Sequence, residues 1–163
     1  MESGQAHEEK MHGRSEKRSP YTTLAIALAI NGVVMYVITY AMIASIDHFH
    51  ANINRAYMAG MMVAPMITVM LLMMRSMFTN RALNVLLHVG AVALFVGFFL
   101  LARTQTAVGN EQFLHSMIPH HSSAILMCDE ANITDPEIRT LCEQIVKAQK
   151  EEIAQMEEIL ARY

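Results

Sequence analysis

The sequence predicts an all-α membrane protein, with three transmembrane helices followed by an antiparallel helical hairpin outside the membrane. Of its 163 residues, 53% are apolar and only 17% are charged, whereas a soluble domain carries about 25% charged residues. Residues 20–102 contain four charged side chains, all between apolar runs: Asp47, Arg55, Arg75 and Arg81. A net charge of −3 with no basic face excludes a nucleic-acid-binding protein.

The N-terminal segment, residues 1–20, is polar, mixed in charge and without apolar periodicity. Such a composition cannot bury enough apolar surface to fold alone. We therefore expect a disordered cytosolic tail, in which His7 and His12 are favoured as tail residues without a role over a part in metal capture.

Three apolar runs follow, at about residues 21–46, 56–74 and 82–102. Each is close to or above the roughly 20 residues that span a bilayer core. The first run is too long for a signal-peptide core, so we expect it to be retained. Residues 21–103 are thus predicted to form a three-helix transmembrane anchor.

Basic residues predict the orientation of this anchor. Six of them flank the ends expected to be cytosolic: Lys10, Arg14, Lys17, Arg18, Arg75 and Arg81. Only Arg55 and Arg103 flank the other ends. Positive charge stays on the cytosolic side, so the N-terminus is expected in the cytosol of a bacterium. The C-terminal part is then periplasmic or extracellular, and the anchor lies in the inner (cytoplasmic) membrane.

The soluble part, residues 104–163, contains two predicted helices. The first covers about residues 109–131. The second begins at Thr134-Asp135-Pro136-Glu137, a capping residue followed by proline and an early acid, and continues to the C-terminus. The short connection between them requires an antiparallel hairpin.

Both predicted helices carry a seam with heptad-like spacing. The first seam consists of Phe113, Met117, His120, Ala124, Met127 and Ala131. The second consists of Ile138, Cys142, Ile145, Gln149, Glu152, Met156 and Ile159. In an antiparallel hairpin with this turn, His120 is expected to face Gln149, and Met117 to face Glu152.

Thioether and imidazole donors on one buried face suit copper, Cu(I) especially. Zinc would leave the methionines unused, and the Glu-x-x-His pairs of a di-iron site are missing from this segment. The alternative is a helical core in which methionine fills space and the histidines bond to Gln149 and Glu152.

The stretch Met117-Ile-Pro-His-His-Ser-Ser-Ala124, with Met127 and the later Gln149, Glu152-Ile153 and Met156, resembles the bacterial domain-of-unknown-function family number 305. The resemblance covers about residues 104–160. It implies a ferritin-like helical fold, here a half-bundle, and supports copper binding. By position, the implied metal ligands are Met117, His120, His121 and Met127, with Met156 as a further candidate and Gln149 and Glu152 beside them. Cys128 and Cys142 depart from the family's pattern.

The loop between the first two spans offers an auxiliary metal site of Asp47, His48 and His50, although a solvated loop is the favoured interpretation.

The second span carries five methionines at helical spacing: Met62, Met66, Met70, Met73 and Met77. Packing or lipid contact is favoured for them over a copper path, because polar groups are scarce in this span.

The sequence therefore predicts a membrane-anchored metal-binding protein that captures or buffers copper or confers resistance to it. The alternative is a structural or sensory protein whose hairpin binds a partner. No nucleophile–base arrangement or phosphate loop is recognisable, so an enzyme is not expected.

Two further expectations concern the hairpin. Cys128 and Cys142 fall in facing layers, but packed helices lie about 8–10 Å apart and a disulfide needs Cα atoms within about 7 Å. A reduced, buried pair is thus slightly favoured over a bond. Two helices also leave apolar side chains in water, so we expect a two-fold symmetric homodimer.

Overall fold

The structure, a computed structural model, describes residues 19–163. The predicted tail up to residue 18, with His7 and His12, lies outside the described residues. Within them the fold is all-helical and contains no strand, as predicted. The elements are α2 (Pro20–Ile38), the short η1 (Ile46–His48), α3 (Ile53–Met73), α4 (Arg81–Arg103), α5 (Asn110–Glu130) and α6 (Pro136–Leu160).

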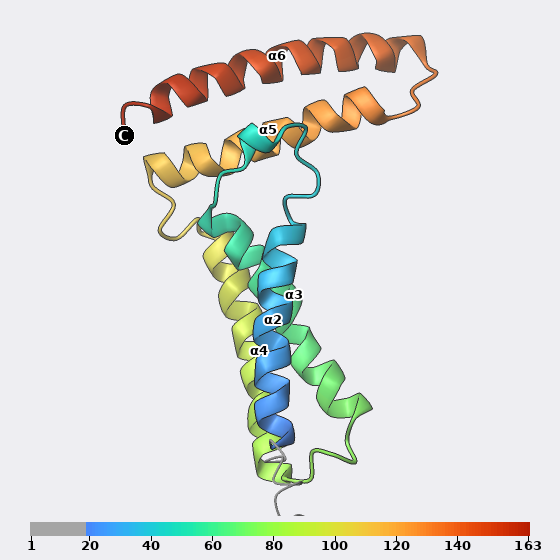
Figure 1. The fold of residues 1–163 in the computed structure, drawn as a ribbon, viewed down its shortest axis with the longest axis vertical. Coiled ribbons are helices and arrows are strands. Elements are labelled where there is room, and N and C mark those ends of the chain that lie inside the picture. Colours follow the sequence, from blue (N-terminus) through green and yellow to red (C-terminus); the bar gives the residue numbers. More distant parts are fainter. Residues whose placement is uncertain (1–18) are drawn as a thin grey trace, which may run out of the picture.

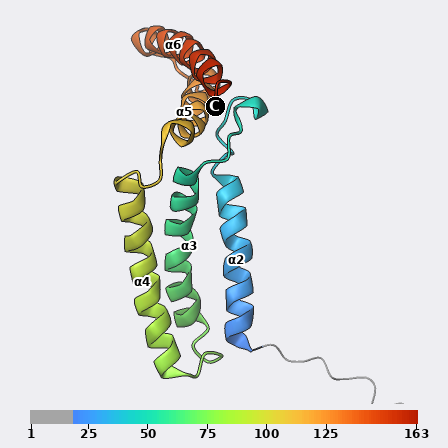
Figure 2. The same cartoon turned by 90° about the vertical axis from the view of Figure 1, so that its left-hand side faces the viewer.

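Helices α2, α3 and α4 are long and apolar enough to cross a membrane. They run side by side, with α3 between α2 and α4 (Figure 2). Gly60 of α3 allows the closest packing, because a Cβ at this position would lie 2.6 Å from the Phe98 ring of α4.

The first helix is shorter than the sequence predicts, ending at Ile38 instead of near residue 46. The Thr39 hydroxyl donates to the carbonyl of Tyr36 at 2.6 Å. Tyr40 is buried outside the helix, and its hydroxyl donates to the carbonyl oxygen of His50 at 2.8 Å. Residues 39–52 thus form a connection between α2 and α3, which we call the α2–α3 loop.

The hairpin of α5 and α6 lies across the ends of the three apolar helices, with α5 nearer to them and α6 farther away (Figure 1). The predicted start of α6 is confirmed: the Asp135 side chain accepts hydrogen bonds from the backbone nitrogens of Glu137 and Ile138. A buried cluster of Ile118, Ile125 and Ile153 holds the two helices together.

The predicted seam of α5 is wrong by one residue. Phe113 and Met127 are 51% and 60% exposed, and His120 is exposed as well. Four of the side chains that the helix buries are one position later: Leu114, Ile118, His121 and Ile125. Pro119 and Ser122 are buried as well. One residue corresponds to a rotation of about 100°. Helix α5 is rotated about its axis relative to the prediction because it packs against both α6 and the α2–α3 loop.

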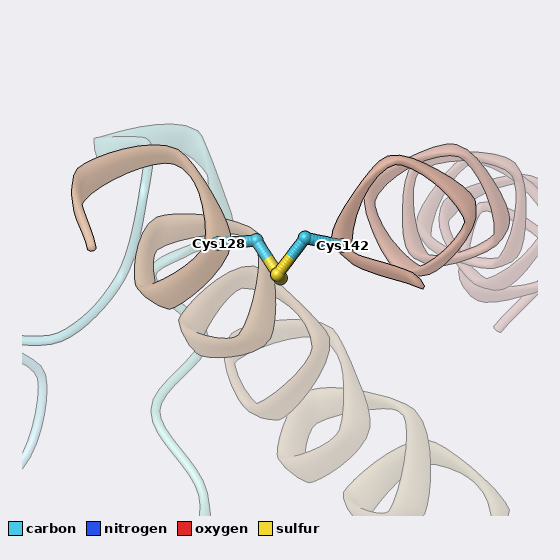
Figure 3. The surroundings of a disulfide bond; sticks show 2 residues. All are labelled: Cys128 and Cys142. Carbon is cyan, nitrogen blue, oxygen red and sulfur yellow. A yellow bond between two sulfur atoms is a disulfide. The ribbon is translucent and has the colours of Figure 1, made fainter. Parts of the chain in front are cut away.

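The preference for a reduced cysteine pair is also wrong, since Cys128 and Cys142 form a disulfide (Figure 3). Their Cα atoms are 5.4 Å apart, within the range of such bonds. The usual interaxial distance describes a whole helix contact, whereas these residues lie beside the turn that joins the two helices.

Candidate metal site

His121 is the histidine that the fold places between the two hairpin helices. It is 8% exposed. Its Nδ1 lies 2.9 Å from the backbone carbonyl oxygen of Met117, one turn earlier in α5. Its Nε2 lies 2.7 Å from Oε2 of Glu152 in α6. Because a carbonyl oxygen only accepts, Nδ1 donates, and Nε2 is the nitrogen directed at the carboxylate.

This contact replaces the facing pairs expected from the sequence, Met117 with Glu152 and His120 with Gln149. The same one-residue rotation of α5 explains the change, because it brings His121 to α6 and leaves His120 exposed. The two adjacent imidazole rings are edge-on, with centroids 6.0 Å apart.

The predicted ligands fall into two groups. Met117 is half-buried one turn before His121, and the half-buried Met156, one turn after Glu152, packs on the isoleucine cluster. His120 and Met127 face solvent, and Met127 lies about 15 Å along the helix from Met117. The first group therefore lies one helical turn from His121 or Glu152 along the chain, and the second lies at the surface. Gln149 is half-buried, three residues before Glu152.

Within residues 19–163, no three His, Cys, Asp or Glu side chains converge to hold a metal ion. An ion at His121 would therefore need sulfur donors from Met117 or Met156 in addition to nitrogen and oxygen. Thioether donors select soft ions such as Cu(I) and are poor ligands for hard ions.

A second face of α5 docks on the α2–α3 loop. Ser122 is fully buried there, and its Oγ accepts from the backbone nitrogen of Ala44 at 2.7 Å and lies 2.8 Å from Nδ1 of His48. One helical face thus contacts α6 while its neighbour contacts the loop.

Further bonds join α5 to the beginning of α3. The backbone nitrogen of Ile53 donates to Oε1 of Gln112 at 3.1 Å, and Asn54 Nδ2 donates to Oγ of Ser116 at 3.1 Å. The hairpin is therefore attached to the apolar helices by polar contacts along one side of α5.

The three residues of the predicted auxiliary site point to different partners. Asp47 is exposed, and its carboxylate accepts from the Ser45 hydroxyl at 3.2 Å. His48 contacts Ser122. The ring of His50 stacks on that of His115 in α5, with centroids 5.2 Å apart and planes inclined by 24°.

Burial lowers the pKa of His50, and the neighbouring His115 and His48 lower this pKa further, against the opposing charge of Glu157. His115 is not among the residues predicted from the sequence. The available signal was its position seven residues before Ser122, which places both side chains on one face of a helix.

The sequence pattern of the family described as Domain of unknown function (DUF305) matches residues 98–160. An uncharacterized protein of Acanthamoeba polyphaga mimivirus is 33% identical over 118 residues, which cover 71% of this chain and 76% of the relative. An alignment of that length extends beyond the hairpin into the apolar helices. No solved structure matches the chain.

Proposed function

The chain belongs to the DUF305 family, and we propose that it is a membrane-anchored protein that captures or buffers copper, Cu(I) above all. One observation carries the proposal. The Nδ1–H of His121 bonds to a backbone carbonyl, while Nε2 faces the α6 side chains at the hairpin contact. This is the arrangement by which proteins fix the tautomer and ring orientation of a metal-binding histidine.

In this proposal each hairpin residue has a different role in binding the copper ion. His121 supplies an oriented nitrogen, and Met117 and Met156 supply soft thioether sulfurs nearby. His120 and Met127, being exposed, are accessible to an arriving ion. Glu152 is 52% exposed at its side chain and lies 2.7 Å from Nε2, so it can take the proton that Nε2 loses when it binds an ion.

The proposed location is the inner (cytoplasmic) membrane of a bacterium, with a cytosolic N-terminus and a periplasmic or extracellular hairpin. The distribution of basic residues supports this orientation. The Cys128–Cys142 disulfide supports it independently, because such bonds persist in oxidising compartments and are rare in the cytosol.

We also propose a homodimer through the hairpin. Three large apolar side chains of α5 and α6 remain about half exposed and have no role in the proposed metal site: Phe113, Ile138 and Leu141. Their burial against a second copy would contribute roughly 1.5–3 kcal/mol for each fully buried side chain. Light scattering of the full chain in detergent tests this proposal, since a mass of one chain per micelle contradicts it.

The same exposed side chains favour the second candidate function, a structural or sensory protein whose hairpin binds a partner protein without metal. Metal content distinguishes the two candidates. Protein purified without added metal contains copper under the first proposal and none under the second.

The decisive experiment is a competition titration of the full chain in detergent with Cu(I) and a coloured Cu(I) chelator. Replacing both His120 and His121 by alanine is expected to weaken binding at least tenfold, about 1.4 kcal/mol. Met66→Leu in α3 serves as the control and should leave affinity unchanged. Equal affinity of the double variant and the parent would overturn the proposal.

A further inference from the structure

The turn between α5 and α6 carries a motif that the proposed copper site does not use. Asn132-Ile133-Thr134 is the only Asn-x-Ser/Thr triplet in the chain, and its middle residue is not proline. Such a triplet is the acceptor of N-linked glycans in chains that leave the cytosol. Because so short a pattern also arises by chance, its place in the fold decides whether it can be used.

An acidic residue makes the motif more specific. Glu130 lies two residues before Asn132 and is exposed, which gives the longer pattern acid-x-Asn-x-Thr. Bacterial N-glycosylation enzymes select this longer pattern, and a carboxylate at its first position can pair with a basic side chain of the enzyme.

The motif lies outside the helices, where an enzyme can reach it. Helix α5 ends at Glu130 and α6 begins at Pro136. Asn132 and Thr134, which supply the amide to be modified and the hydroxyl of the motif, are both exposed. The turn is at the end of the hairpin that projects beyond the apolar helices (Figure 1). Attachment of a glycan there displaces no packed side chain.

The hydrogen bonds of this turn leave both side chains available. The backbone nitrogen of Ile133 donates to the carbonyl oxygen of Ala131 at 2.8 Å, and Nη2 of Arg139 donates to the carbonyl oxygen of Ile133 at 3.1 Å. Neither bond uses the side chain of Asn132 or Thr134, so an enzyme can bind the motif without opening either helix.

The disulfide supports a compartment in which such a reaction takes place. Cys128 and Cys142 lie on either side of the motif in the sequence and are bonded to each other, and such bonds persist outside the cytosol. Chains that carry N-linked glycans receive them on this same side of the membrane.

We propose that Asn132 is an N-glycosylation site, whose donor is a glycan carried on a polyprenyl diphosphate. Nδ2 of Asn132 forms a bond to C1 of the first sugar, and the bond from C1 to the diphosphate oxygen breaks. The amide releases one proton to solvent, and polyprenyl diphosphate leaves without any transfer of electrons. The site rests on the proposed outer location of the hairpin and is independent of copper.

The test is the intact mass of the full chain purified from its own cell membranes. The mass should exceed that of the sequence by one glycan, and fragmentation of the tryptic peptide of residues 104–139 should place this glycan on Asn132. Asn132→Gln and Thr134→Ala should each abolish the added mass. Asn110→Gln is the matched control, because Asn110 is an exposed asparagine of the same peptide without a serine or threonine two positions later. A parent of unmodified mass, or added mass that persists in Asn132→Gln, would overturn the proposal.

A labelling experiment separates the reasons for an unmodified chain. Spheroplasts are treated with a membrane-impermeant reductant and a membrane-impermeant maleimide, which label Cys128 and Cys142 only if the hairpin is outside. These are the only cysteines of the chain. A labelled but unmodified chain contradicts the glycosylation site alone, and an unlabelled chain contradicts the outer location as well. The Cu(I) titration in detergent depends on neither result, so failure of the copper proposal is recognised separately.

Discussion

His121 and Glu152 form the one ion pair found among residues 19–163, with Nε2 and Oε2 2.7 Å apart. The two side chains differ in environment, because the imidazole is 10% exposed and the carboxylate 52% exposed. The pair thus lies at the edge of the hairpin contact. Both ring nitrogens are engaged, Nδ1 by the Met117 carbonyl and Nε2 by the carboxylate, so an incoming ion would have to displace the proton of Nε2.

Replacing Glu152 by glutamine should lower the stability of the hairpin slightly. The carboxylate is half exposed, so its loss should cost no more than about 1 kcal/mol. Thermal unfolding followed by circular dichroism measures the effect. Glu158→Gln, an exposed carboxylate of the same helix, should cause no change, and equal effects of the two substitutions would contradict a role for the ion pair.

Cys128 and Cys142 should be alkylated only after a reductant has broken the disulfide between them. Mass spectrometry measures the number of alkylated thiols. The bond closes a short loop, with a sequence separation of 14. Serine at both positions should therefore lower the free energy of unfolding by about 3 kcal/mol. The parent in reductant is the control and should match the serine variant. Two alkylated thiols in untreated protein would show that the bond is missing.

Ser122→Ala should loosen the α2–α3 loop. The substitution removes the acceptor of the Ala44 amide and the partner of His48 at a fully buried position, a loss of about 1–3 kcal/mol. Hydrogen exchange of the Ala44 amide should accelerate. The neighbouring Ser123→Ala is the matched control, since its hydroxyl donates only within α5, to Pro119. Unchanged protection of Ala44 would rule out Ser122 as an anchor of the loop.

Contact between the loop and the hairpin should weaken as the pH falls below about 6.5, the ordinary pKa of histidine. The pKa of His50 is lowered in the folded chain by burial and by the nearby His115 and His48, while Glu157 opposes the shift. The undocked loop therefore binds the proton more readily than the docked one, and stability is lost as the pH falls from 6.5 towards the lowered value.

Hydrogen exchange of residues 44–53, corrected for intrinsic rates, measures this change between about pH 7.5 and about pH 5.5. His50→Gln removes the titrating group and should flatten the dependence. A parent whose protection stays constant over this range would contradict the assignment to His50.

Much of the fold could be predicted because its elements are set by local patterns. Apolar runs of sufficient length indicated α2, α3 and α4, and the Asp135-Pro136 cap identified the start of α6. The family motif was readable from Met117 to Ala124 for the same reason, since its residues are adjacent in the sequence. The end of α2 could not be predicted, because it depends on Tyr40, which lies outside the helix and donates a hydrogen bond to the carbonyl oxygen of His50, ten residues later.

The sequence by itself determined the helical class, the apolar helices, the hairpin and the presence of a His-His pair in it. Only the tertiary structure decided which of those histidines meets Glu152, that Cys128 bonds with Cys142, and that His115 lies against His50. The physical reason is the rotation of α5 about its axis. Spacing fixes which side chains share a helical face, but α6 and the α2–α3 loop together select which faces are buried.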